Sequence, residues 1–155
     1  GVELNEMAVR QLFEDLQLVP TTTATGGMTC LNAGDLEVFV GDFFTLAPDM
    51  LDPVDAVFDR GALVALPEDM RARYARHLTG IAGHAPQLLV TFEYDQTQMD
   101  GPPFSIGDAD VRRHYQDSYR VSSLASVDVA GKLKGKCDAT ENVWLLHPRR
   151  DTSAS

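Results

Sequence analysis

Cysteine, long apolar runs and clustered basic residues are all scarce in this chain of 155 residues. Its two cysteines, Cys30 and Cys137, lie far apart in the sequence, so they form no metal or disulfide framework and suit a reducing, cytoplasmic compartment. No apolar stretch reaches the roughly 18 residues that a membrane-spanning helix needs. No run of Lys or Arg exceeds two, and the net charge is −10. Nucleic acid and membranes are therefore not expected as partners.

Arrangements of catalytic and metal-binding side chains are missing as well. None of the four histidines has a partner at metal-ligand spacing, and no Ser/His/Asp or Cys/His combination is visible. Ser105 lacks the strand–turn–helix setting of an activated serine. We therefore predict neither a catalytic nucleophile nor a bound metal.

The chain does contain enough apolar residues, 44%, for one globular domain with a proper core. We expect residues 1–150 to form this single domain and residues 151–155 to be a disordered tail. The first residue is Gly1 rather than Met, which suggests that the true start of the protein is missing.

The spacing of apolar residues predicts strands that alternate with helices. The expected strands are 1–4, 28–31, 36–40, 54–58, 87–94, 119–127 and 142–146. Helices are expected after Asn5, from Pro67 and near Asp108, and residues 21–27 are expected to form a loop. This order predicts an α/β fold with a mainly parallel sheet and an antiparallel C-terminal hairpin.

Ligands of such sheets bind beyond the carboxyl ends of the strands, and Glu3 is the first acid at such an end. Its carboxylate could accept hydrogen bonds from both hydroxyls of a ribose, as acids do in NAD-binding domains. The alternative is a surface acid that interacts favourably with the N-terminus of the following helix.

Residues 41–44, Gly-Asp-Phe-Phe, follow the strand expected at 36–40. The glycine permits close backbone approach, Asp42 could accept a hydrogen bond from an amino group, and Phe43 could flank a flat ring. These are the requirements of an adenine site. The alternative is a loop whose aromatic residues pack in the core, which is our preferred interpretation for Phe44.

Asp59-Arg60 follows the strand expected at 54–58, and Tyr94 lies at the end of the strand expected at 87–94. Arg60 could bind a carboxylate with two hydrogen bonds or stabilise a developing anion. Alternatively, it pairs with Asp59 and only fixes the turn.

Residues 101–104, Gly-Pro-Pro-Phe, form a stiff segment that ends in an aromatic ring, Phe104. This segment could be a wall above a flat substrate, or simply a rigid connector.

Four segments in this order, GVELNEMAV, VGDFFTL, FDRGALVAL and FEYDQTQMDGPPFSI, resemble the thiopurine S-methyltransferases, especially the bacterial ones. The resemblance extends from Gly1 to about Phe104 and more weakly to Leu146. It implies the Rossmann-like sheet of S-adenosylmethionine-dependent methyltransferases, with strand order 3-2-1-4-5-7-6 and an antiparallel seventh strand.

The resemblance also implies roles for individual residues. Glu3 would bind the ribose of S-adenosylmethionine, and Asp42 and the Phe43 backbone would surround its adenine. Arg60 would lie near both cofactor and substrate, and Tyr94 and Phe104 would line the substrate side.

The implied reaction moves a methyl group from S-adenosylmethionine to the sulfur of a small aromatic or heterocyclic thiol. Bacterial members are also associated with selenium and tellurium acceptors, and members of the family usually work as monomers. Residues 132–135 align with a stretch where relatives often carry an arginine, but only lysines are available here, so we assign them no role.

The chain departs from the family in its N-terminal part. The usual first helix, the central first strand and an LCGKS-type loop for the methionine half of the cofactor are not found, so we expect a chain that lacks its N-terminal third. The alternative is an inactive fragment that acts only as a binding module. A dinucleotide cofactor is a third possibility, which the GDFF and DRGAL segments disfavour.

Overall fold

The computed structural model describes residues 1–149, so the tail predicted at 151–155 lies outside the described residues. The described chain forms two compact units, with the boundary between Asp52 and Pro53, and each unit has a sheet of its own. The single domain over residues 1–150 stays a prediction.

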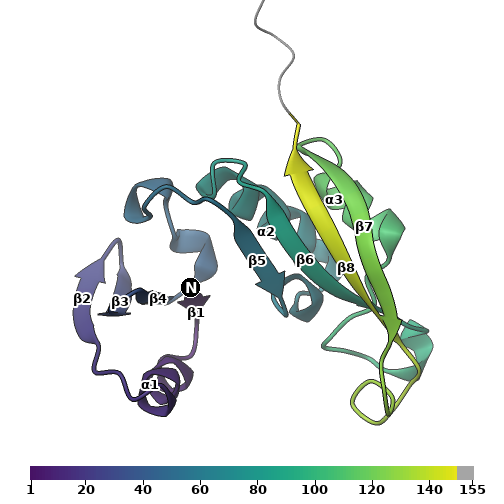
Figure 1. Ribbon diagram of the computed structural model, residues 1–155, viewed down its shortest axis with the longest axis horizontal. Helices are drawn as coiled ribbons and strands as arrows, with labels where there is room; N and C mark the ends of the chain where they lie inside the picture. Colours follow the sequence, from purple (N-terminus) through teal and green to yellow (C-terminus); the bar gives the residue numbers. More distant parts are fainter. Residues whose placement is uncertain (150–155) are drawn as a thin grey trace, which may run out of the picture. The chain divides into compact units, whose positions relative to one another are not determined.

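Both units combine helices and strands, but they alternate only from β5 to β7 in the second unit, whereas β2, β3 and β4 of the first unit follow one another directly (Figure 1). The helices are α1 (Glu6–Asp15), α2 (Glu68–Ile81) and α3 (Asp108–Tyr115). The strands are β1 (Val2–Glu3), β2 (Thr21–Thr25), β3 (Met28–Ala33), β4 (Leu36–Val40), β5 (Val57–Arg60), β6 (Gln87–Glu93), β7 (Tyr119–Asp128) and β8 (Thr140–Pro148). Within residues 1–149, no helix is long and apolar enough to cross a membrane.

The first unit is a four-stranded sheet in the order β1-β4-β3-β2 with helix α1 beside it. Asn5 caps the helix as predicted, because its side-chain oxygen accepts hydrogen bonds from the backbone N–H groups of Met7, at 3.0 Å, and Ala8, at 3.4 Å. Val9 and Phe13 of α1 pack with two strand residues, Leu31 and Val38, in a small buried cluster.

Two local predictions for this unit are wrong. Residues 21–25 are not a loop but strand β2, which pairs with β3 through a turn that needs only Gly26 and Gly27. Four of the five residues of β2 are β-branched threonines, which favour extended backbone even where the strand is exposed. The apolar spacing after Asn5 also predicts that Leu12 and Leu16 pack in the core with Val9 and Phe13, but they are 40% and 51% exposed.

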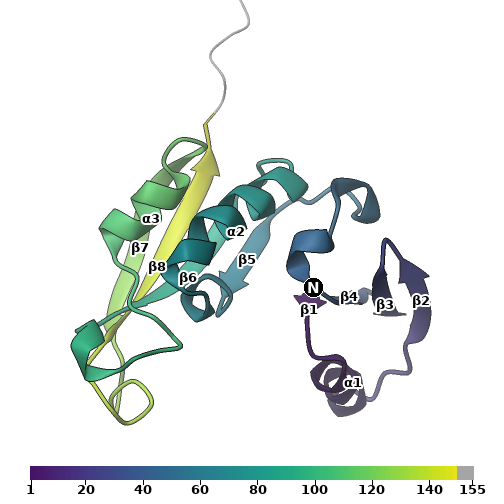
Figure 2. The same ribbon diagram turned by 180° about the vertical axis from the view of Figure 1, so that it is seen from behind.

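The second unit is a four-stranded sheet in the order β5-β6-β8-β7. Its strands β7 and β8 form the predicted antiparallel C-terminal hairpin. Figures 1 and 2 show α2 and α3 on the same face of this sheet. The buried residues of the sheet include Trp144, the sole tryptophan of the chain, which is 4% exposed and donates a hydrogen bond to Thr91 Oγ1.

The fold is therefore α/β, with two mixed sheets and three helices in the described residues. A mainly parallel sheet is not confirmed: of the six ladders within residues 1–149, only β1–β4 and β5–β6 are parallel. The unexpected strand β2 adds an antiparallel ladder to the first unit. In the second unit, β8 returns beside β6 and makes antiparallel ladders on both of its edges.

Asp59 links three elements of the second unit. It is 3% exposed, and its Oδ1 accepts hydrogen bonds from the N–H groups of Ala62, at 3.3 Å, and Leu63, at 3.4 Å. Its Oδ2 accepts one from the hydroxyl of Tyr74, at 3.0 Å. Desolvation by burial raises the pKa of this carboxyl, while these hydrogen bonds oppose the rise. The side chain therefore ties the end of β5 to the turn after it and to α2.

Replacing Asp59 with Ala should lower the free energy of unfolding by about 1–3 kcal/mol, because it leaves buried donors without an acceptor. Urea unfolding followed by the fluorescence of Trp144 measures this change within the second unit. Asp117→Ala, at an exposed position, serves as the control. Equal effects of the two substitutions would contradict the structural role of Asp59.

Candidate active site

Glu3 and Asp42 both lie at the carboxyl ends of parallel strands in the first sheet. Strands β1 and β4 are parallel neighbours in which Glu3 lies opposite Val40. The N–H of Gly41 donates to the carbonyl oxygen of Glu3 at 3.0 Å, which continues the ladder by one residue. The structure thus brings together two of the acids that the sequence singled out, at the carboxyl ends of two parallel strands.

Each of these two carboxylates uses one oxygen for the local backbone. Glu3 Oε1 accepts from the N–H of Asn5 at 2.9 Å, and Asp42 Oδ1 accepts from the N–H of Phe44 at 3.0 Å. Both side chains are exposed, and within the described residues Glu3 Oε2 and Asp42 Oδ2 have no hydrogen-bond partner. Local capping therefore accounts for half of each carboxylate and leaves an acceptor for a ligand.

The backbone between these acids requires a residue without a side chain. Gly41 has φ 150°, and a Cβ there would lie 3.2 Å from Met28 Cε and Cγ, which is tighter than an ordinary contact. The next two aromatic residues, Phe43 and Phe44, meet edge to face with ring centroids 5.7 Å apart. Both are half-buried, so Phe44 is not the fully buried core residue of our preferred interpretation.

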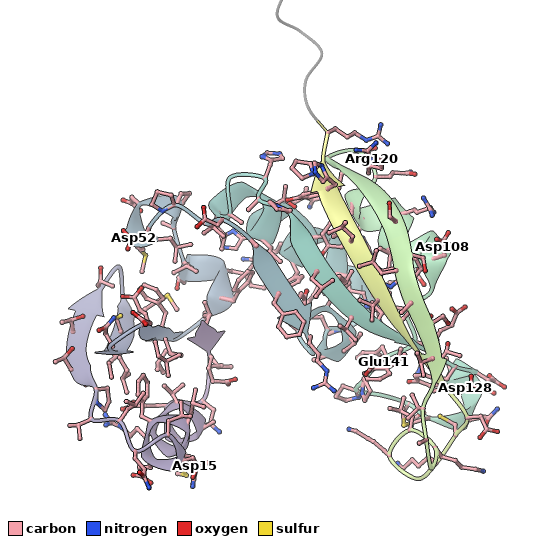
Figure 3. The ribbon with its side chains drawn as sticks, in the orientation of Figure 1. Asp15, Asp52, Asp108, Arg120, Asp128 and Glu141 are labelled. Carbon is pink, nitrogen blue, oxygen red and sulfur yellow. The ribbon has the colours of Figure 1, made fainter. Side chains whose placement is uncertain are left out.

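Arg60 is the last residue of β5 in the second unit, and its side chain is 62% exposed. Its Nη2 lies 3.8 Å from Oε2 of Glu141, which Figure 3 labels on β8. Such a long, exposed ion pair contributes only about 0–1 kcal/mol. A pair between Arg60 and Asp59, the alternative role considered from the sequence, is wrong, because Asp59 is turned to Tyr74 and the following turn.

Tyr94 directly follows β6 and fixes the segment 101–104. Its hydroxyl donates to the carbonyl oxygen of Pro103 at 2.7 Å and accepts from Gln96 Nε2 at 2.9 Å. Its backbone N–H donates to Ser105 Oγ at 3.0 Å. Desolvation is the largest influence on the phenol and raises its pKa, so Tyr94 stays neutral at physiological pH.

The segment 101–104 is also anchored at its other positions. Phe104 donates its N–H to the carbonyl oxygen of Val64 at 2.7 Å, and Lys134 Nζ donates to the carbonyl oxygen of Pro102 at 2.7 Å. Gly101 has φ +88°, and a Cβ there would lie 2.6 Å from Cδ1 of the Phe104 ring. The segment is therefore a rigid connector that also presents an aromatic ring in a fixed place.

Arg71 is a residue of this region that sequence reasoning missed. It is 6% exposed, its Nε donates to the carbonyl oxygen of Leu66 at 2.9 Å, and its guanidinium lies 5.2 Å from the centroid of the Phe104 ring. The apolar pattern of α2 predicts a buried stripe that begins at Met70, but Met70 is only half-buried. The spacing of Arg71 to Tyr74 and Leu78, three and seven residues on, is the signal that places a charge on this buried face.

Comparisons with known proteins decide the family. The sequence profile described as Thiopurine S-methyltransferase (TPMT) matches residues 1–148. The chain belongs to this family.

Several relatives from different organisms share this similarity. The chain is 53% identical to the thiopurine S-methyltransferase of Xanthobacter autotrophicus over 146 residues, which is 94% of this chain and 68% of the relative. For the thiopurine S-methyltransferase of Gluconobacter oxydans the identity is 46% over 148 residues, with 96% and 67% covered. For the probable thiopurine S-methyltransferase of Yarrowia lipolytica it is 37% over 150 residues, with 95% and 70% covered.

The family resemblance expected from the sequence is thus confirmed, and the protein is an enzyme of the methyltransferase class. The chain spans about two thirds of the length of these relatives. The cofactor residues Glu3, Asp42, Phe43 and Arg60 stay predictions. The same holds for the substrate residues Arg60, Tyr94 and Phe104.

Replacing Gly101 with Ala should displace the Phe104 ring and lower the free energy of unfolding by roughly 2–4 kcal/mol, the sum of a positive-φ penalty and overpacking. Gly131→Ala is the matched control, because Gly131 has φ +74° but no atom within 4 Å of its Cβ position. Urea unfolding monitored by Trp144 fluorescence compares the two variants. If the free energy of unfolding falls by the same amount in both variants, the close approach of Gly101 to Phe104 makes no measurable contribution to stability.

Proposed function

We propose that this enzyme transfers a methyl group from S-adenosylmethionine to the sulfur of aromatic or heterocyclic thiols such as thiopurines, and that selenium and tellurium species are further acceptors. The observation that carries the proposal is the family match over residues 1–148, which includes every candidate site residue. The relatives' names refer to the same reaction at sulfur.

The chemistry of the first unit fits a nucleoside. Ribose hydroxyls and the adenine amino group are hydrogen-bond donors, and Glu3 and Asp42 each keep one carboxylate oxygen without a partner in the described residues. We therefore propose that Glu3 binds the ribose, and that Asp42 and the backbone of Phe43 bind the adenine. Bound S-adenosylmethionine would supply a methyl group on a positively charged sulfur, which makes the departing thioether a good leaving group.

We propose that Arg60, Tyr94 and Phe104 of the second unit bind and orient the acceptor. The exposed guanidinium of Arg60, held only weakly by Glu141, favours the negatively charged thiolate over the neutral thiol. Acidic thiols such as thiopurines ionise near neutral pH, so no dedicated base is needed. Alignment of the two reactants can lower the barrier by up to about 7–11 kcal/mol.

We further propose the Rossmann-like methyltransferase sheet as the architecture of the family member. Support comes from the order β5-β6-β8-β7, which equals the order expected for the fourth, fifth, seventh and sixth strands. A monomer in the cytoplasm is our proposal for the protein's state, supported by the acidic charge and the two free thiols. The alternative of an inactive binding module is not favoured, since the relatives are named as enzymes.

Calorimetric titration of the 155-residue chain with S-adenosylhomocysteine should show micromolar binding. Glu3→Gln and Asp42→Asn should each weaken this binding about tenfold or more, because a charge-assisted hydrogen bond is lost. Glu6→Gln, at an exposed acid paired with Arg10 on α1, should bind as the parent does. Equal affinities of all three variants would remove Glu3 and Asp42 from the cofactor site, and an absence of binding by the parent chain would refute the cofactor proposal for this chain.

Arg60→Ala should lower methyl transfer to a thiopurine at least about tenfold without unfolding the protein, because the charge that favours the thiolate is removed. The measurement is kcat/KM together with a thermal melt of each variant. Arg120→Ala removes another exposed arginine, labelled on β7 in Figure 3, and should leave turnover unchanged. Unchanged turnover in Arg60→Ala would refute the role of Arg60.

A further inference from the structure

Arg71 carries a charge that the second unit buries but does not neutralise by an ion pair. The side chain is 6% exposed, and only its Nε has a hydrogen-bond acceptor, the carbonyl oxygen of Leu66. Within the described residues, its terminal nitrogens Nη1 and Nη2 have neither a hydrogen-bond acceptor nor a carboxylate within 4.0 Å. Buried guanidinium groups normally have such partners, because an unpaired buried charge is costly.

These nitrogens belong to a side chain that lines a pocket of about 490 Å³, a size typical of small-molecule sites. One wall is the ring of Phe104, and Cζ of the guanidinium lies over this ring, 5.2 Å from its centroid. Pro67, at the start of α2, adds further apolar lining. The positively charged, planar guanidinium of Arg71 beside the apolar groups of Phe104 and Pro67 is suited to a flat ligand that carries an anionic group at one end.

Most other polar groups of this pocket are already engaged. Gln96 donates to Tyr94 Oη and to the carbonyl oxygen of Met99, and its Oε1 accepts from the N–H of Ser105. Ser105 Oγ exchanges hydrogen bonds with the backbone of Tyr94.

Two of the three acids that line the pocket form ion pairs with an arginine other than Arg71. Glu68 and Asp110 both pair with Arg113, at 3.3 and 2.6 Å. Asp100 is exposed and forms no ion pair with Arg71. Its charge opposes any anion in the pocket, so a ligand with a single negative charge, paired with Arg71, is favoured over a ligand with two.

We propose that Arg71 and Phe104 form a subsite for the carboxylate of a flat aromatic acid, and that the preferred acceptor is an aryl thiol that carries one carboxylate. The two terminal nitrogens of Arg71 match the two oxygens of a carboxylate, as in bidentate arginine–carboxylate pairs. The acceptor part of this inference rests on the proposed function, which assigns Phe104 to the substrate side. The carboxylate subsite itself does not depend on it.

Titration of the full 155-residue chain with benzoate and with its neutral analogue benzamide tests the subsite. Benzoate should bind about tenfold or more tightly than benzamide, and Arg71→Gln should abolish this preference. Arg71→Lys keeps the positive charge but lacks the planar guanidinium that binds both carboxylate oxygens, so its preference for benzoate over benzamide should be intermediate. Arg76→Gln, at an exposed arginine of the same helix, should retain the full preference. Equal binding of benzoate and benzamide by the parent protein would overturn the proposal.

A measurement on the unsubstituted protein covers the case in which Arg71→Gln fails to fold. Benzoate should shift the backbone amide NMR signals of Ser105 and Asp110, which line the pocket, and leave those of Glu6 and Arg10 on α1 unchanged. Shifts confined to residues outside the pocket would overturn the assignment.

The acceptor preference is tested with 4-mercaptobenzoate and thiophenol in the methyl-transfer assay. The ratio of their kcat/KM values should fall about tenfold in Arg71→Gln and stay unchanged in Arg76→Gln. If neither thiol is methylated but benzoate still binds through Arg71, the proposed function fails and the subsite stands. If both are methylated with the same ratio in Arg71→Gln, the function stands and the acceptor inference fails.

Discussion

The buried carboxylate of Asp59 is the interaction on which the second unit's candidate site depends. Arg60 is the next residue and the last of β5. Its position depends on Asp59, which accepts hydrogen bonds from Leu63 in the turn after the strand and from Tyr74 of α2. Because three donors meet one buried acid, the strand end, the turn and the helix are positioned together. The same helix carries Arg71, so one polar cluster places both arginines.

The two units use acids in contrasting ways. In the first unit, Glu3 and Asp42 are exposed, and one oxygen of each has no hydrogen-bond partner in the described residues. In the second, Asp59 is buried and both of its carboxylate oxygens accept hydrogen bonds from the protein itself. Exposure thus separates a carboxylate that can recognise a ligand from one that maintains the backbone, although both follow or end a parallel strand.

Features encoded by neighbouring residues could be predicted from the sequence. The Asn5 cap, the C-terminal hairpin and the acids at strand ends depend on local patterns that leave little choice. Strand β2 was missed because its exposed threonines show no apolar alternation; their β-branched side chains favour extended backbone, and pairing with β3 completes the strand. The spacing of Arg71 to Tyr74 and Leu78 places it on the buried face of α2, but its contact with Phe104, 33 residues later, is tertiary and has no local sequence signal.

Tyr94 contributes to the rigidity of the segment 101–104. The phenol hydroxyl, the Ser105 hydroxyl and Lys134 attach this segment to the end of β6 and to the β7–β8 connection. A segment fixed at so many points has little conformational entropy left to lose, so any ligand that contacts it keeps more of the contact energy as affinity. If Phe104 lines the acceptor site as proposed, this rigidity makes the site selective for the shape of the acceptor, because larger rings must fit the space that Phe104 leaves.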